Sequence, residues 1–177
     1  MLARFLRKKS IKVAARALYD QLSAASRDPT LYGHGRVADT PDGRFELLAL
    51  HASVFFTRLA KKGPQAEETS QEVFDILFSA MDHALRELGV GDISVGKRIR
   101  KLAESFYGRL AVNNESIAAA DTDPTHLVHA IATHVLEAPE QGIFFAEKLA
   151  NRILAWSADL AAQSDATLLS GDMSLPK

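Results

Sequence analysis

Apolar residues recur every three or four positions along almost the whole chain, which is the spacing of one face of an α-helix. The pattern predicts helices at about residues 4–26, 41–59, 69–88, 95–110 and 115–120, then one starting at Asp123-Pro124 and a last long one starting at Pro139. No stretch shows the alternation of period two that indicates a strand. We therefore expect an all-α fold, a single-domain compact helical bundle of about six to seven helices.

The predicted helix at 41–59 is apolar on two faces, one carrying Phe45, Leu48 and Phe55 and the other Leu47 and Leu50. Because a helix that is apolar on two faces is surrounded by others, we expect it at the centre of the bundle. Thr40-Pro41 supplies an N-cap and a proline for its first turn, and Gly89 supplies a stop for the following helix.

The chain has 177 residues, which fits one ordinary domain. We expect a single helical domain at residues 1–165 and a flexible tail at 166–177, because the residues after Gln163 are small and polar. Cysteine is absent, which excludes disulfides, thiol nucleophiles and thiolate metal sites. The formal net charge is −1, so any surface that binds nucleic acid would have to be local, and we expect no DNA partner.

The amino terminus is locally basic, with six cations and no acid among the first 16 residues. It lacks the uninterrupted apolar run of a secretory signal, and no stretch is long and apolar enough to cross a membrane. A short organelle transit peptide would have a similar composition, but the helical pattern continues without a break, which favours a retained first helix. Packing of that helix and peripheral contact with anionic lipid remain alternatives. The candidate membrane contacts are Leu2, Arg4, Phe5, Leu6, Arg7, Lys8, Lys9 and Lys12.

A second basic cluster consists of Lys97, Arg98, Arg100 and Lys101. It is either a solvated helix face or a docking surface for phosphates or an acidic partner. Interleaved aromatic residues, which would favour single-stranded nucleic acid, are not evident. Reversing these four charges should lower cosedimentation with membranes or ribosomes if the cluster docks there.

Two other groups of polar residues have a chemical and a structural interpretation. His126, His129 and His134 are the nearest approach to a metal cluster, but no carboxylate at helical spacing accompanies them, so solvated histidines are the alternative. Asp42, Arg44 and Glu46 at the start of the central helix suggest an ionic network between helices. We expect no catalytic residue, no metal and no cofactor.

Three stretches together resemble one family: AARALYD at 14–20, TPDGRFELLALH at 40–51 and LFSAMDHALRELGVGDISVGKRIRKLAESFYGRL at 77–110. They are similar to the ubiquinol-cytochrome c chaperone family, whose mitochondrial members assist assembly of respiratory complex III. The resemblance extends over about residues 12–120 and fades beyond. The positions that match the family's motifs are 42–46, 89–92, 94–98 and 106–109.

The resemblance implies an all-helical, non-enzymatic assembly factor that binds newly made cytochrome b, in mitochondria together with a small partner subunit near the ribosomal exit tunnel. We expect partner binding at Asp42, Arg44, Phe45, Glu46, Asp92, Ser94, Lys97, Arg98, Arg100, Lys101, Tyr107 and Arg109. The mitochondrial pattern has a longer extension before the first helix, whereas this chain has almost none. We therefore expect a bacterial cytoplasmic version, peripheral on the inner face of the cytoplasmic membrane, with the matrix face as the eukaryotic equivalent. The alternative function is a helical ligand or metal carrier, or an enzyme, using the region of His126, His129 and His134.

Overall fold

The computed structural model describes residues 2–120, 122–136 and 139–175, without the side chains of residues 2–5, 93, 139 and 141. Within these residues the fold is all-α, with no β-strand. The elements are α1 (Leu2–Ser26), the short 3₁₀ helix η1 (Pro29–Leu31), α2 (Pro41–Leu59), α3 (Pro64–Glu87), α4 (Asp92–Ala119), α5 (Thr125–His134), α6 (Pro139–Ala162) and α7 (Asp165–Leu169). The predicted fold class is confirmed.

Helix α2 is the central element, as its two apolar faces predict. It packs against α1, α3, α4 and α6, and Leu47, Leu50 and Phe55 are fully buried. The side-chain oxygen of Thr40 accepts a hydrogen bond from the Gly43 amide, so the expected N-cap forms. The start of α2 is therefore fixed by its own sequence, and its course by the burial of both faces.

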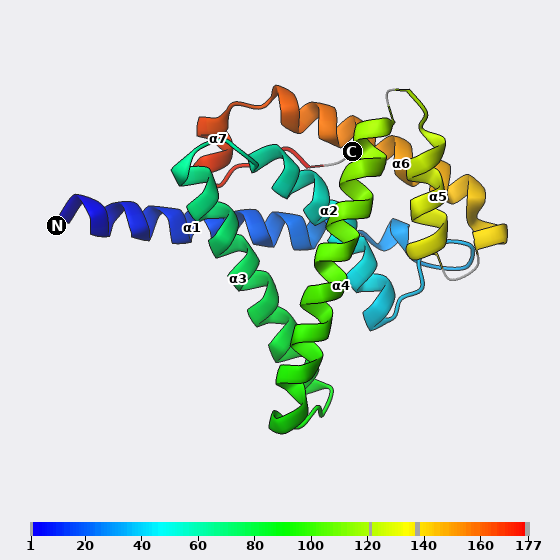
Figure 1. Cartoon of the computed structure of the whole chain (residues 1–177), viewed down its shortest axis with the longest axis horizontal. Coiled ribbons are helices and arrows are strands. Elements are labelled where there is room, and N and C mark those ends of the chain that lie inside the picture. The colour runs from blue at the N-terminus through cyan, green and yellow to red at the C-terminus, as the bar shows by residue number, and fades with distance from the viewer. Residues whose placement is uncertain (1, 121, 137–138, 176–177) are drawn as a thin grey trace.

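Helices α3 and α4 form a hairpin whose closed end points away from the rest of the molecule (Figure 1). Gly89, at a φ of +82°, ends α3 in a Schellman motif, in which the Val90 amide donates to the Leu85 carbonyl and the Gly89 amide to the Arg86 carbonyl. The glycine stop predicted at this position is confirmed.

The predicted limits of these two helices were wrong. Helix α3 begins at Pro64, several residues before the expected start at 69 or 70, because Ala66 and Thr69 are both fully buried in the bundle. Helix α4 continues to Ala119, so 115–120 is its last turns and no separate helix. Asn113 and Ser116 are buried within it, and the Asn113 amide donates to the Ser53 hydroxyl of α2, 3.1 Å away.

The carboxyl-terminal segment also differs from the expected flexible tail, at least through Leu175. Helix α7 buries Leu168 completely, and Met173 is 3% exposed. The Gln21 side chain of α1 donates to the Gly171 carbonyl and accepts from the Met173 amide, at 2.8 and 3.1 Å. Residues 171–173 thus pack on α1 and α7 contacts α3, while 176–177 lie outside the described residues.

Candidate functional site

An apolar groove of about 420 Å³ opens between the amino-terminal half of α2 and the carboxyl-terminal half of α3. Its apolar lining comes from four helices and consists of Tyr19, Phe45, Leu48, Leu77, Ala80, Met81, Ala84, Leu85, Leu88 and Leu102. Most of these side chains are partly exposed, and Leu88 is 66% exposed. The groove is therefore an open apolar surface and not a closed core cavity.

The groove lies where α3 and α4, which are both longer than α2, extend beyond it. They have 24 and 28 residues, against 19 in α2. At about 1.5 Å per residue, the hairpin extends beyond α2 (Figure 1). Its last turns have no partner along one face among the described residues, so the apolar stripe that is core at Val73 and Leu77 becomes groove wall at Met81 and Leu85.

Charged residues form the rim of the groove where α2 begins. The Arg44 guanidinium donates to the Asp39 carboxylate at 2.7 Å, and more than half of each side chain is exposed. This hydrogen bond lowers the pKa of Asp39 below its usual value and raises that of Arg44. Asp42 is in the first turn of α2, where its negative charge is favourable to the helix dipole. The rim can therefore pair with charges that flank an apolar ligand.

Gly43 holds the start of α2 against the preceding loop. A Cβ atom at this position would lie 2.2 Å from the Ala38 carbonyl oxygen, which is closer than any real contact. Only glycine permits this approach, so the position of the rim residues Arg44 and Asp39 depends on it.

The groove candidates Asp42, Arg44 and Phe45 are brought together, whereas Glu46 is directed elsewhere. Its carboxylate accepts a hydrogen bond from Arg109 of α4 at 2.6 Å, and the two side chains are 15% and 29% exposed. This is the ionic link between helices that the sequence suggested, but Arg44 has no part in it, since Arg44 pairs locally.

An aromatic cluster behind the groove joins α2, α3 and α4. Phe106 is fully buried, and the rings of Phe45 and Phe78 lie edge-on to it, with centroids 6.4 and 5.5 Å away. Tyr107 stacks on Phe74 at 5.5 Å and is 57% exposed. Tyr107 therefore joins the two helices of the hairpin, Arg109 links the hairpin to α2, and neither lines the groove.

The remaining candidates from the hairpin lie near its closed end, as exposed side chains. The Asp92 carboxylate pairs with Arg86 of α3, and Ser94 is exposed in the first turn of α4. The four cations of the basic cluster are also exposed: Lys97, Arg98, Arg100 and Lys101. They form a separate charged surface beside the apolar groove.

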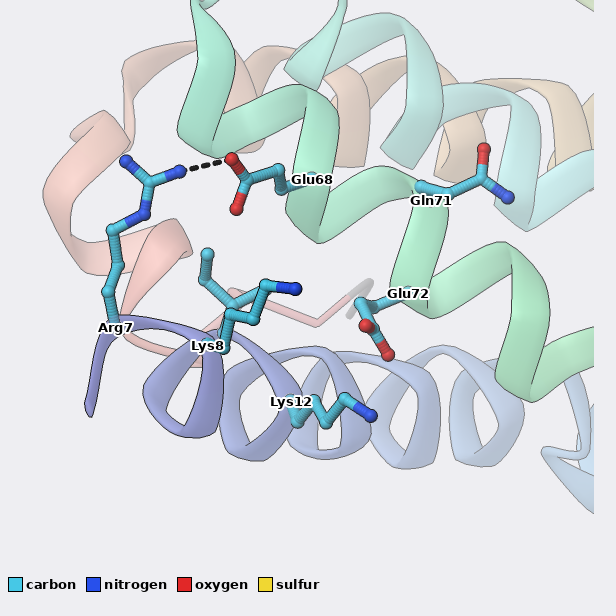
Figure 2. A pocket seen from close by; sticks show the side chains of 7 residues that line it. Arg7, Lys8, Lys12, Glu68, Gln71 and Glu72 are labelled. Atoms are coloured by element: carbon cyan, nitrogen blue, oxygen red, sulfur yellow. Dashed lines mark hydrogen bonds and ion pairs between the residues drawn. The ribbon is translucent and has the colours of Figure 1, made fainter. Parts of the chain in front are cut away.

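The amino-terminal candidates lie on α1, whose first turns project beyond the other helices (Figure 1). The side chains of Leu2, Arg4 and Phe5 are outside the described residues, and those of the other five candidates are exposed. Figure 2 shows the surface groove between α1 and α3, where Arg7 pairs with Glu68 and Lys12 lies opposite Glu72. In the described parts of the chain, no helix is both long and apolar enough to span a bilayer.

The three histidines considered for metal binding line one hollow between α4 and α5, with a volume of about 380 Å³. His126 lies 3.8 Å from the Asp123 carboxylate, and burial lowers the pKa of His134. Among the residues that the structure describes, no group of three or more His, Asp or Glu side chains has the arrangement of a metal site.

Sequence reasoning missed a buried polar cluster between α2 and α6. The His51 ring is fully buried; its Nδ1 donates to the Leu47 carbonyl at 2.7 Å, and its centroid lies 5.5 Å from that of Trp156. Burial lowers the pKa of His51 to about 4, so the imidazole is neutral. The Trp156 indole donates to the Ser174 carbonyl at 2.6 Å. The only signal in the sequence was a histidine inside a helix that is apolar on two faces.

These features define a class: an all-α protein in which a helical hairpin and a central helix enclose an open, apolar groove with a charged rim. Residues 34–175 match the family described as Ubiquinol-cytochrome C chaperone, and the chain belongs to this family. The chain is also similar to a solved structure described as the Cbp3 homolog from Brucella abortus, with 32% sequence identity and a TM-score of 0.83, covering 100% of this chain and 97% of that one. No curated protein matches the sequence. The family stated from the sequence is confirmed, but the expected extent was wrong, because the match continues to residue 175 and does not fade after about residue 120.

Proposed function

We propose that this protein is an assembly chaperone of ubiquinol-cytochrome c reductase that binds newly made cytochrome b in the groove between α2 and α3. The open apolar groove is the observation that carries the proposal. Membership of a chaperone family supports it, and it agrees with the expectation of a protein that is not an enzyme.

The chemistry of the groove suits a segment of an unassembled membrane protein. Such a client exposes apolar side chains that would otherwise aggregate, and a helix with an apolar face can dock on partly exposed Met81, Leu85 and Leu88. Methionine adapts to varied surfaces because its side chain is unbranched and flexible. Arg44 and Asp42 at the rim can pair with the polar residues that flank a membrane segment.

The test is a pair of exposed substitutions, Leu88→Glu in the groove and Phe144→Glu on α6 as its control. Both side chains are 66% exposed, so neither change should unfold the protein. In a strain lacking the wild-type gene, we expect Leu88→Glu to reduce assembled reductase and the crosslinking of cytochrome b to a photoreactive residue placed at Met81. Phe144→Glu should restore both. Full assembly with Leu88→Glu, at equal protein abundance, would contradict the assignment of the groove.

The proposed place of action is the inner face of the cytoplasmic membrane, or the corresponding matrix face in a mitochondrion, because the client is a membrane protein. The exposed cations of α1 support peripheral binding there. For the alternative of a metal carrier, the described residues bring together no group of three or more side chains that could hold a metal ion.

A further inference from the structure

The solvent-facing side of α1 combines exposed apolar and cationic residues in one stripe. Ile11, Ala15 and Leu18 are buried and mark the face that packs on the bundle. At 100° per residue, Leu6 and Val13 fall on the opposite side, seven residues and nearly two turns apart. They are 55% and 64% exposed, although both are large and apolar.

Basic residues flank this apolar pair. Lys9 and Arg16 share the outward face with Leu6 and Val13, and Lys12 lies at its edge; all three cations are exposed. A shallow hollow of about 550 Å³ runs along the face, lined by Lys8, Lys9, Lys12, Val13 and Arg16. The first acidic residue of the chain is Asp20, which pairs with Arg16 at 3.0 Å.

The acidic residues of the neighbouring helix α3 face only the edge of this stripe, at Lys12. Glu68 and Glu72 of α3 line the other side of α1, where Glu68 pairs with Arg7 (Figure 2). Lys12 lines both the groove with these acids and the outward hollow, whereas Lys9 and Val13 line only the outward one. Arg16 pairs with Asp20 and Lys12 lies opposite Glu72, whereas no described acidic residue forms an ion pair with Lys9, so the outward stripe keeps an excess of positive charge.

We propose that the outward face of α1, comprising Leu6, Lys9, Lys12, Val13 and Arg16, is a docking surface for an anionic lipid bilayer. Lysine and arginine attract the lipid phosphates, while Leu6 and Val13 enter the headgroup boundary. The position of the helix agrees with this role, because its first turns project beyond the other helices (Figure 1). A nucleic acid fits less well, since none of these five residues is an aromatic on which a base could stack.

The test measures binding of the full-length protein to vesicles of phosphatidylcholine alone and of phosphatidylcholine mixed with phosphatidylglycerol. The variant Lys9→Gln/Lys12→Gln removes two charges from α1, and Lys97→Gln/Lys101→Gln removes two equally exposed charges from α4 as the control. Each lysine near an anionic surface strengthens binding about fivefold, so we expect the α1 pair to weaken partitioning about thirtyfold. The α4 pair should bind as the wild type does. Circular dichroism and the melting temperature establish that each variant is folded.

A second variant, Leu6→Ser/Val13→Ser, separates a bilayer from other phosphates. Both residues are more than half exposed, so the fold should persist, and vesicle binding should fall about tenfold or more. The proposal is overturned if phosphatidylglycerol does not increase vesicle binding of the wild type, or if the α4 pair loses as much binding as the α1 pair. It is also overturned if the serine variant still binds vesicles while the wild type binds an RNA oligonucleotide equally well. None of these outcomes involves cytochrome b, so the result is independent of the proposed chaperone function.

Discussion

Acidification should destabilise this protein through the buried His51 side chain. Its pKa falls from 6.5 to about 4 on folding, chiefly because burial disfavours the charged imidazolium, while the hydrogen bond to the Leu47 carbonyl opposes the change. The unfolded chain therefore binds more protons between these two pH values. The stabilisation is complete above pH 6.5 and is lost as the pH falls toward 4.

The magnitude follows from the separation of the two pKa values. Each pH unit between 6.5 and 4 lowers the free energy of unfolding by about 1.4 kcal/mol, so His51 alone removes about 3 kcal/mol over this range. That is a large share of the about 5–15 kcal/mol typical of a domain. The pKa values of Asp28, Asp39 and Asp123 are lowered from the usual 3.8. These carboxylates therefore change the stability only at a lower pH, outside this window.

Urea unfolding at a series of pH values measures the effect, with the fluorescence of Trp156 as the probe. It is the only tryptophan, is 1% exposed, and lies beside the His51 ring. The variant His51→Gln should be less stable near neutral pH but should lose about 3 kcal/mol less than the wild type on acidification. The control His126→Gln removes an exposed histidine and tests whether the loss of any histidine has this effect. Parallel stability curves for wild type and His51→Gln would refute the reasoning.

Three further predictions concern stability, each checked by urea denaturation. Gly43→Ala should lower the free energy of unfolding by about 1–3 kcal/mol, because the new Cβ would overlap a backbone oxygen 2.2 Å away. Gly91→Ala, with open space around it, should change the free energy of unfolding by no more than about 0.5 kcal/mol. Equal losses for the two variants would contradict this. Leu168→Ala should cost about 2–5 kcal/mol, since the side chain is fully buried, and a near-zero cost would show that α7 does not stabilise the fold. Glu46→Gln should cost about 1–2 kcal/mol, less than a fully buried pair because Arg109 is 29% exposed. Adding Arg109→Gln should recover part of that loss, so simple additivity of the two changes would argue against a coupled pair.

Local signals in the sequence predicted the parts of the fold that local chemistry determines. Thr40-Pro41 predicted the start of α2 and Gly89 the end of α3, since capping depends on residues within one turn. The apolar period predicted the central position of α2, because a helix apolar on two faces can be buried only by several neighbours.

Features that depend on distant contacts were not accessible in the same way. The sequence pattern predicted a polar tail at residues 166–175, yet Leu168 and Met173 are buried against elements far away in the sequence. The pattern predicted that α3 starts after Gly63 and a polar segment, whereas it starts at Pro64 because Ala66 and Thr69 are buried. For the candidate site, the sequence supplied Asp42, Arg44 and Phe45 but not the wall formed by α3. Its apolar stripe looks the same whether a neighbouring helix covers it or not.

The contact between the two ends of the chain has a consequence for how the protein is made. Residues 171–173 are synthesised long after α1, yet they complete the packing of α1 through Gln21 and the backbone around Gly171. Until they have been made, this face of α1 lacks its cover. The packing of the first described helix is therefore completed only at a late stage of synthesis.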